Sequence, residues 1–270
     1  MERYLTTGVK AIIDDHPGVG DILERYHIAC VPCTVGTCTL ADVVKFHHLT
    51  SQRQAQLMWE IEKALYPDRC VPSPEVLPEE ELPPPAAHRF SPPVRRLVEE
   101  HVWIKRLLAV LPSILEEIES TGQFDAALIR DVLDFIRGYA DKLHHLKEEG
   151  ILFDYVDPEE ELVKVIYQDH SSARGHVRAA GEAVAGDDID DLCRSLRCYR
   201  ELLTEHIDKE DGVLFPYIDR GLTTTQVGEL FRRFDEADGQ LEDDVPERYE
   251  RFIMDLESKY EGAASTSDNP

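Results

Sequence analysis

A ten-residue segment that occurs twice constrains the fold of this chain more than any other feature. The copies read His144-His145-Leu146-Lys147-Glu148-Glu149-Gly150-Ile151-Leu152-Phe153 and His206-Ile207-Asp208-Lys209-Glu210-Asp211-Gly212-Val213-Leu214-Phe215. Their alignment pairs His144 with His206 and Glu148 with Glu210, so each copy contains a His-x-x-x-Glu pair. Residues four apart on a helix lie on one face. Two helices that each present an imidazole and a carboxylate are what a bundle needs to hold a pair of metal ions.

Long segments around the two copies show the periodicity of helices. Their apolar residues recur at three- and four-residue spacing rather than in alternation. The predicted helices span residues 94–120, 124–153, 159–184 and 187–217, with shorter ones at 224–237 and 246–260. We therefore predict an all-α fold. Residues 94–262 form a four-helix up-down bundle with C-terminal helices, and residues 263–270 form a disordered tail.

A proline-rich stretch separates this bundle from the N-terminal part of the chain. Nine of the 16 prolines lie between residues 67 and 93. Proline lacks a backbone donor and fixes an extended backbone, so the stretch is predicted to be a semi-rigid linker. Residues 1–66 are predicted to form a small helical domain that contains cysteines, with helices at 40–47 and 51–65.

The charge and the hydropathy of the chain exclude several classes of partner. With 29 basic and 54 acidic residues the net charge is -25, which argues against binding to nucleic acid or to an anionic membrane. No apolar run approaches the roughly 20 residues of a membrane span. The first residues lack the basic start and apolar segment of a signal peptide, so we expect a cytoplasmic protein. Six cysteines are too few for a disulfide scaffold in a chain of 270 residues.

Each predicted bundle helix places one histidine among apolar neighbours. These histidines are His101, His144, His170 and His206. A single core histidine is more often a hydrogen-bonded structural residue than a metal ligand. Burying four imidazoles and two carboxylates without a cation, however, costs several kcal/mol or more for each unpaired charge. The predicted metal ligands are therefore these four histidines, with Glu148 and Glu210 bridging two ions.

The predicted ligands indicate which metal is bound. Nitrogen and oxygen donors without a thiolate suit iron, manganese or zinc, and disfavour calcium, which prefers oxygen alone. Four histidines and two bridging carboxylates leave coordination positions open for a small ligand such as dioxygen or nitric oxide. Iron is the metal whose chemistry uses such open positions most directly.

Several neighbouring residues allow two interpretations. His145 and Glu149 form a second His-x-x-x-Glu pair, but helical geometry places His145 on a more polar face, as a supporting or surface residue. The acids that directly precede ligands could orient imidazoles, or simply point to solvent. These acids are Glu100, Asp169 and Glu205.

Three closely spaced cysteines form a second candidate site in the N-terminal domain. Cys30, Cys33 and Cys38 could bind zinc or an iron–sulfur cluster, or form a reversible redox pair, and Cys70 could add a fourth thiolate. The alternative is free thiols, since the chain has no second pair at zinc-ribbon spacing.

Residues 94–260 resemble a hemerythrin-like (HHE cation-binding) domain. The resemblance rests on Glu100-His101, His144-x-x-x-Glu148 with Leu152-Phe153, Asp169-His170, and His206-x-x-x-Glu210 with Leu214-Phe215-Pro216. It implies a non-haem di-iron centre, Fe2+ or Fe3+, bridged by oxo and carboxylate groups. Oxygen-carrying hemerythrins have a second histidine where this chain has Arg174, whereas one histidine fewer resembles the repair-of-iron-centres branch. Asp211 matches the oxygen carriers, which keeps it as an alternative ligand.

The resemblance implies a di-iron protein that responds to nitric oxide or oxidants and helps restore damaged iron–sulfur centres. Its partners would be a small diatomic ligand, oxygen or nitric oxide, and iron–sulfur client proteins. The alternatives are an oxygen-binding sensor or store, an enzyme that reduces nitric oxide or decomposes peroxide, and a purely structural metal bundle. The sequence leaves the oligomeric state open, with a homodimer as one option.

Overall fold

Apolar residues at helical spacing form helices throughout the described chain, as the sequence predicts. The computed structural model describes residues 2–26, 28, 39–46, 49, 51–67, 69, 74, 89–240 and 245–264. These residues contain no β-strand, only an isolated bridge between Gly8 and Thr39. The chain divides into two units, Met1–Arg89 with Gly212–Arg220, and Phe90–Asp211 with Gly221–Pro270.

The first unit contains five N-terminal helices around a small apolar core. They are α1 (Glu2–Leu5), α2 (Val9–Asp15), α3 (Pro17–Arg25), α4 (Leu40–Phe46) and α5 (Ser51–Leu65). Pro17 begins α3, where a missing backbone donor has no cost. Leu23 from α3 packs in one cluster with Leu57 and Ile61 from α5, and all three are fully buried. The three clustered cysteines and Cys70 lie outside the described residues.

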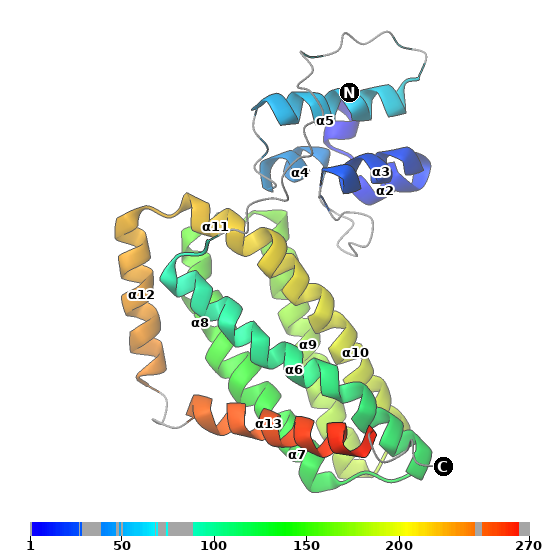
Figure 1. The fold of residues 1–270 in the computed structure, drawn as a ribbon, viewed down its shortest axis with the longest axis vertical. Helices are drawn as coiled ribbons and strands as arrows, with labels where there is room; N and C mark the ends of the chain where they lie inside the picture. Colours follow the sequence, from blue (N-terminus) through cyan, green and yellow to red (C-terminus); the bar gives the residue numbers. More distant parts are fainter. Residues whose placement is uncertain are drawn as a thin grey trace. The chain divides into compact units, whose positions relative to one another are not determined.

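The second unit is built on four long helical segments, which lie side by side in Figure 1. They are α6 (Pro92–Thr121); α7 (Ala126–Phe135) with η1 (Ile136–His145) and α8 (Leu146–Gly150); α9 (Glu161–Gly186); and α10 (Ile189–Lys209). After α10 the chain continues through η3 (Glu210–Leu214) into α11 (Phe215–Gly221), and Gly212–Arg220 of this stretch belong to the first unit. A short η2 (Leu152–Tyr155) follows α8, and α12 (Thr224–Asp238) and α13 (Val245–Ala264) complete the chain. The predicted helical bundle is thus confirmed.

Local signals at the helix ends produce the tight connections of the bundle. The Asp125 carboxylate accepts hydrogen bonds from two backbone N–H groups in the first turn of α7, and Asp188 accepts one at the start of α10. Gly122 ends α6 and Asp187 ends α9 with positive φ, the left-handed conformation that stops a helix. These caps set the alternating direction of neighbouring helices.

A continuous apolar core fills the space between the four segments. Leu107 and Leu111 from α6, Leu133 from α7 and Leu196 from α10 are buried in one cluster, to which α13 adds Ile253. Burying a side chain of this size stabilises the fold by roughly 1.5–3 kcal/mol. The core therefore holds the helices rigidly around the polar residues at its centre.

Two π-helical segments interrupt the α-helices at the duplicated sequences. The ten-residue η1 ends at His145, and the five-residue η3 begins at Glu210. The sequence predicts continuous α-helices there. A π segment closes its hydrogen bonds over five residues rather than four, so side chains after it point to a different face, and such segments are frequent at functional sites.

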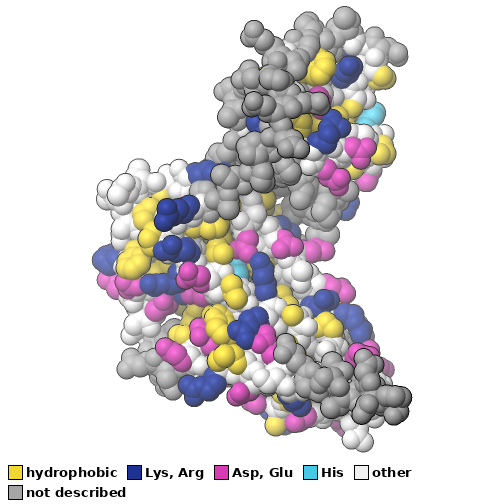
Figure 2. Space-filling view, viewed as in Figure 1, with side chains coloured by type: hydrophobic (Ala, Val, Ile, Leu, Met, Phe, Trp, Pro, Cys, Tyr) yellow, Lys and Arg dark blue, Asp and Glu magenta, His cyan; other side chains and the backbone are white. Residues whose placement is uncertain are grey.

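The described helices show no sign of a membrane segment. None combines the length and the apolar character that spanning a bilayer requires. Figure 2 shows acidic and basic side chains intermingled on the face of the bundle that it draws. On this face (Figure 2) the acidic side chains of the described residues alternate with basic ones and form no patch of a single sign.

Candidate metal centre

The six predicted metal ligands meet at the centre of the bundle. They come from four segments: His101 from α6, His144 and Glu148 from η1 and α8, His170 from α9, and His206 and Glu210 from α10 and η3. None of the six is more than 1% exposed. Charged and polar side chains are rarely buried so completely unless they are paired or bind a metal.

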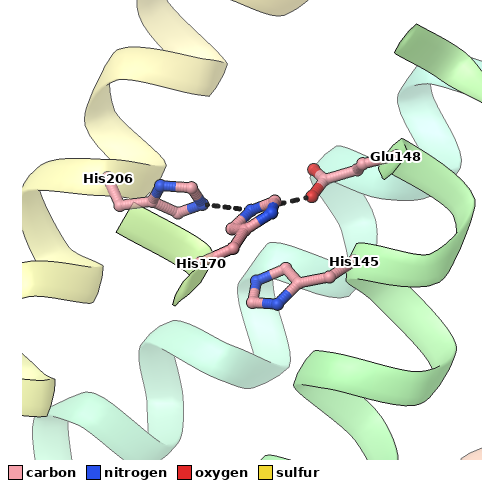
Figure 3. A group of neighbouring side chains, drawn as sticks. All are labelled: His145, Glu148, His170 and His206. Carbon is pink, nitrogen blue, oxygen red and sulfur yellow. Dashed lines mark hydrogen bonds and ion pairs between the residues drawn. The ribbon is translucent and has the colours of Figure 1, made fainter. Parts of the chain in front are cut away.

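The potential ligand atoms form two groups that share one carboxylate. The His101 group contains His101, His144, Glu148 and Glu210; the His145 group contains His145, Glu148, His170 and His206. Within each group one nitrogen or oxygen atom of every residue lies within 4.8 Å of the others. In Figure 3, His170 lies between His206 and Glu148, and its Nε2 is 3.1 Å from Nε2 of His206. Two metal ions could thus be held side by side with Glu148 between them.

The Nε2 atoms of the imidazoles face the two inner glutamates. Nε2 of His144 is 3.1 Å from Glu148, and Nε2 of His206 is 3.1 Å from Glu210. The corresponding distances are 3.3 Å from His101 to Glu210 and 3.4 Å from His170 to Glu148. The nitrogens and carboxylates therefore point to one common space.

The other nitrogen of each ring, Nδ1, faces a second carboxylate outside this space. The Nδ1 contacts are His101 with Asp211 at 2.7 Å, His144 with Glu100 at 2.9 Å, His170 with Glu149 at 2.6 Å and His206 with Asp169 at 3.4 Å. An ionised carboxylate can only accept a hydrogen bond, so each Nδ1 must be the donor and carry the hydrogen. This leaves the Nε2 lone pair for a metal, the arrangement that typically orients histidine ligands.

The inner glutamates provide the test of whether these residues fit a cation. While the imidazoles are neutral and carry their hydrogen on Nδ1, no described residue donates a hydrogen bond to either oxygen of Glu148 or of Glu210, although all four oxygens are buried. Buried carboxylate oxygens without a donor destabilise a fold. A metal ion would supply the missing partner, and the mixed nitrogen and oxygen donors suit iron, manganese or zinc.

The pKa values of the ligands show what a metal would displace. Burial lowers the pKa of His144, but Glu148 and Glu100 outweigh burial and raise it to about 10. In the same way Glu210 and Asp169 raise the pKa of His206 to about 9. Burial and Glu148 raise the pKa of Glu210, yet His206 and His101 lower it to about 2. Imidazolium protons therefore balance the carboxylates, and a metal that binds must release them.

These residues lie within a segment of known type. Residues 93–218 match the family model of the hemerythrin HHE cation binding domain. The matched hemerythrin segment covers slightly less than half of the chain, from the start of α6 into α11, and contains all the residues of both groups. No curated protein and no solved structure matches the chain. The hemerythrin match implies cation binding, in agreement with the two groups, and it includes neither the N-terminal domain nor a particular branch of the family.

Within the hemerythrin segment, each outer carboxylate is itself held by a cation. Each set consists of a histidine, the carboxylate at its Nδ1 and the cation bound to that carboxylate. The four sets are His144, Glu100 and Lys147; His206, Asp169 and Lys209; His101, Asp211 and Lys105; and His170, Glu149 and Arg174. The sequence duplication aligns Lys147 with Lys209 and Glu149 with Asp211. The hydrogen-bonded sets therefore repeat the internal duplication.

His145 departs from the sequence-based placement. It is only 3% exposed, which excludes the surface position, and its ring stacks on that of His170 with centroids 3.9 Å apart. The surface alternative was wrong because it assumed an α-helix, whereas the π-helical η1 turns His144 and His145 toward the same interior; the supporting role stays a prediction. Burial and the neighbouring His170 lower the pKa of His145 to about 3, so its imidazole is neutral.

The structure also places the remaining candidates of the hemerythrin segment. Glu100 and Asp169 orient imidazoles, each on a histidine of another helix, whereas Glu205 is exposed. Asp211 contacts Nδ1 of His101 and belongs to neither group. Arg174 is partly exposed and binds Asp141 and Glu149. The cations behind the carboxylates were not identified from the sequence, although the alignment of Lys147 with Lys209 was a usable signal.

Proposed function

We propose that the bundle holds a non-haem di-iron centre through which the protein responds to nitric oxide or oxidants and helps repair iron–sulfur centres. The observation that carries the proposal is the pair of buried groups that share Glu148. In these groups His101, His144, His170 and His206 each have Nδ1 on a carboxylate and Nε2 toward the inner glutamates. His101 and His144 would serve one ion, and His170 and His206 the other. Glu148 and Glu210 lie against both pairs of imidazoles.

The position of His145 supports adding it to this proposed set of ligands. It lies in the group of His170 and His206, and its imidazole is neutral and therefore able to bind a metal. The side chain comes from the π-helix rather than from α9, where Arg174 takes part in an ion pair instead. We propose that His145 supplies the additional nitrogen on this side of the centre.

Bound iron would supply reversible electron transfer and open positions for a diatomic ligand. The protein's own residues hold the imidazoles in one tautomer, keep the ligand oxygens out of water and balance the charge of the ions. The inward position of Glu210 and the contact of Asp211 with Nδ1 of His101 support the resemblance to the repair-of-iron-centres branch, whereas His145 restores the histidine count of the oxygen carriers. The clustered cysteines could then contact an iron–sulfur client.

Mössbauer spectroscopy with metal analysis of anaerobically purified protein tests the di-iron centre. Stopped-flow mixing of the diferrous protein with nitric oxide and with oxygen then tests the response. Rapid reaction with nitric oxide and no reversible oxygen adduct is the expected result. An adduct that forms on aeration and disappears on deoxygenation would instead establish an oxygen-binding protein, and no reaction with either gas would leave a structural centre.

Two histidine substitutions on α9 test the ligands by metal content. His170→Ala should lower the iron content toward roughly one ion per chain, because the His101 group keeps its ligands. His176→Ala, six residues further along α9 and outside both groups, should leave the content unchanged. Equal iron content in the two variants would contradict the ligand assignment.

A further inference from the structure

A cavity of about 400 Å³ adjoins the His145 group, and His145 is the one proposed metal ligand among its lining residues. Its inner wall is formed by buried residues, among them His145, Ala173, Val177 and Tyr199. Its rim consists of the more exposed Arg137, Asp141, Arg174 and Arg178, so the cavity opens between η1 and α9. The volume falls within the range of roughly 300–1,000 Å³ typical of small-molecule sites.

The cavity extends from the metal centre along the bundle in one direction. Val177 follows His170 by seven residues, and Tyr199 precedes His206 by seven. Because α9 and α10 run in opposite directions, both residues lie on the same side of the centre, roughly 10 Å along the helices. None of the four residues of the His101 group lines the cavity. Only the His145 side of the centre therefore adjoins it.

The phenol of Tyr199 is a buried donor that lacks an acceptor. The side chain is 2% exposed, and no described residue accepts a hydrogen bond from its hydroxyl. Burial raises the pKa of this phenol, so it keeps its proton. A buried donor without a partner loses the hydrogen bond that water would have provided. Tyr199 also lines the cavity, so a molecule bound there could supply the acceptor that the described residues do not.

Two arginines on the rim have no acidic partner among the described residues. Arg174 binds Asp141 and Glu149. Arg137 donates a hydrogen bond to the carbonyl of Val177, and neither Arg137 nor Arg178 has an acidic partner in the part of the chain that the structure describes. Two such guanidinium groups at one opening are unusual in a chain with a net charge of -25. Guanidinium groups attract oxyanions and bind them with paired hydrogen bonds.

We propose that this cavity binds a small oxyanion, which enters between Arg137 and Arg178 and accepts a hydrogen bond from the Tyr199 hydroxyl next to His145. The ligand class follows from the cationic rim and the unused phenol donor together. An uncharged diatomic gas would use neither. The inference goes beyond the proposed di-iron function and does not depend on which metal is bound.

Nitrite, a small oxyanion, is the probe for this cavity. Its Kd is measured by isothermal titration of the protein as purified, for the parent chain and for Tyr199→Phe, with metal content determined on the same samples. Removing the hydroxyl should raise the Kd about tenfold, because a hydrogen bond to an anion is lost. The thermal midpoint should stay the same or rise, since the variant deletes an unsatisfied donor.

Two further variants distinguish the cavity from other nitrite sites. Tyr260→Phe removes a hydroxyl that binds Glu117 on α6, away from the cavity, and should leave the Kd unchanged. Arg178→Gln should slow association, because it removes a charge from the opening. The proposal is overturned if the parent chain does not bind nitrite, or if Tyr199→Phe and Tyr260→Phe bind it equally. Metal analysis reports separately on the di-iron proposal.

Discussion

The side chains behind the histidines determine which ring nitrogen can bind a metal. Each Nδ1 donates to a carboxylate, and each carboxylate is fixed by a lysine or an arginine, for example Lys209 on Asp169 at 2.7 Å. An imidazole without such a partner could rotate or change tautomer. The outer carboxylates therefore preorganise the centre before a metal binds. Their negative charge also offsets part of the positive charge of a bound metal.

The acid behind His170 offers a direct test of this preorganisation. Glu149→Gln keeps the shape of the side chain but removes its charge, so His170 becomes a weaker donor to metal. The affinity for Fe2+, measured by competition with a chelator, should fall about 10-fold or more. Glu205→Gln is the matched control, because Glu205 directly precedes His206 but is exposed. Equal affinities in the two variants would show that the outer carboxylate has no such role.

The sequence could identify six inward residues of the centre and two candidate outer carboxylates, Glu100 and Asp169, but not which histidine each carboxylate contacts. His101 and Glu210 stood out because they lie in apolar helical stripes and the duplicated motif. The contact between His101 and Asp211 joins residues 110 positions apart, and spacing along a single helix carries no information about it. The absence of an acceptor for the Tyr199 hydroxyl likewise depends on packing that only coordinates show.

At the scale of the helix, the π segments explain why the face of His145 was misassigned. Helical faces were assigned with the geometry of an α-helix, and η1 closes wider turns. Adjacent histidines, His144 and His145, consequently serve different groups of ligands. No feature of residues 136–145 announces this change, since π segments depend on how the helix packs. The boundaries of the other long helices agree closely with the sequence prediction.

The packing of η1 against α13 can be tested at one glycine. A Cβ added at Gly138 would lie 1.8 Å from Oη of Tyr249, whose hydroxyl donates to Asp134. Gly138→Ala should therefore displace α13 and destabilise the fold by about 1–3 kcal/mol. Gly228→Ala, in the open on α12, should instead stabilise it by about 0.5–1 kcal/mol. Urea unfolding measures both changes. A stabilising Gly138→Ala would show that α13 does not pack on η1 in this way.

At the scale of the whole bundle, an internal two-fold repeat organises the centre. The relation exchanges α6 with α9 and the first copy of the duplicated segment with the second. It pairs Lys105 with Arg174, each four residues after its histidine, and each bound to the acid of the opposite copy. His145, which aligns with Ile207, breaks this symmetry. The cavity adjoins the same side. The two proposed ions thus have different surroundings, and a ligand would reach them unequally.

Removing the metal should make the stability of the bundle sensitive to alkaline pH. In the metal-free protein the pKa values of His144 and His206 are raised to about 10 and about 9. A raised pKa contributes stability below the ordinary value near 6.5, and that stability is lost as the pH rises through the folded-state value. The lowered pKa values of Glu148 and Glu210 act oppositely, and their contribution is lost only on acidification. The metal-free protein should therefore lose thermal stability between about pH 6.5 and 10.

The metal-loaded protein should not show this loss, because its imidazoles have already released their protons to bind the ions. Circular dichroism at pH 6.5 and at pH 9.5, with chelator or with bound metal, measures the difference in thermal midpoint. Groups elsewhere in the chain titrate equally in both forms, so the difference between the two forms isolates the centre. If both forms lose the same stability between the two pH values, protons and metal ions do not compete for the imidazoles that contact Glu148 and Glu210.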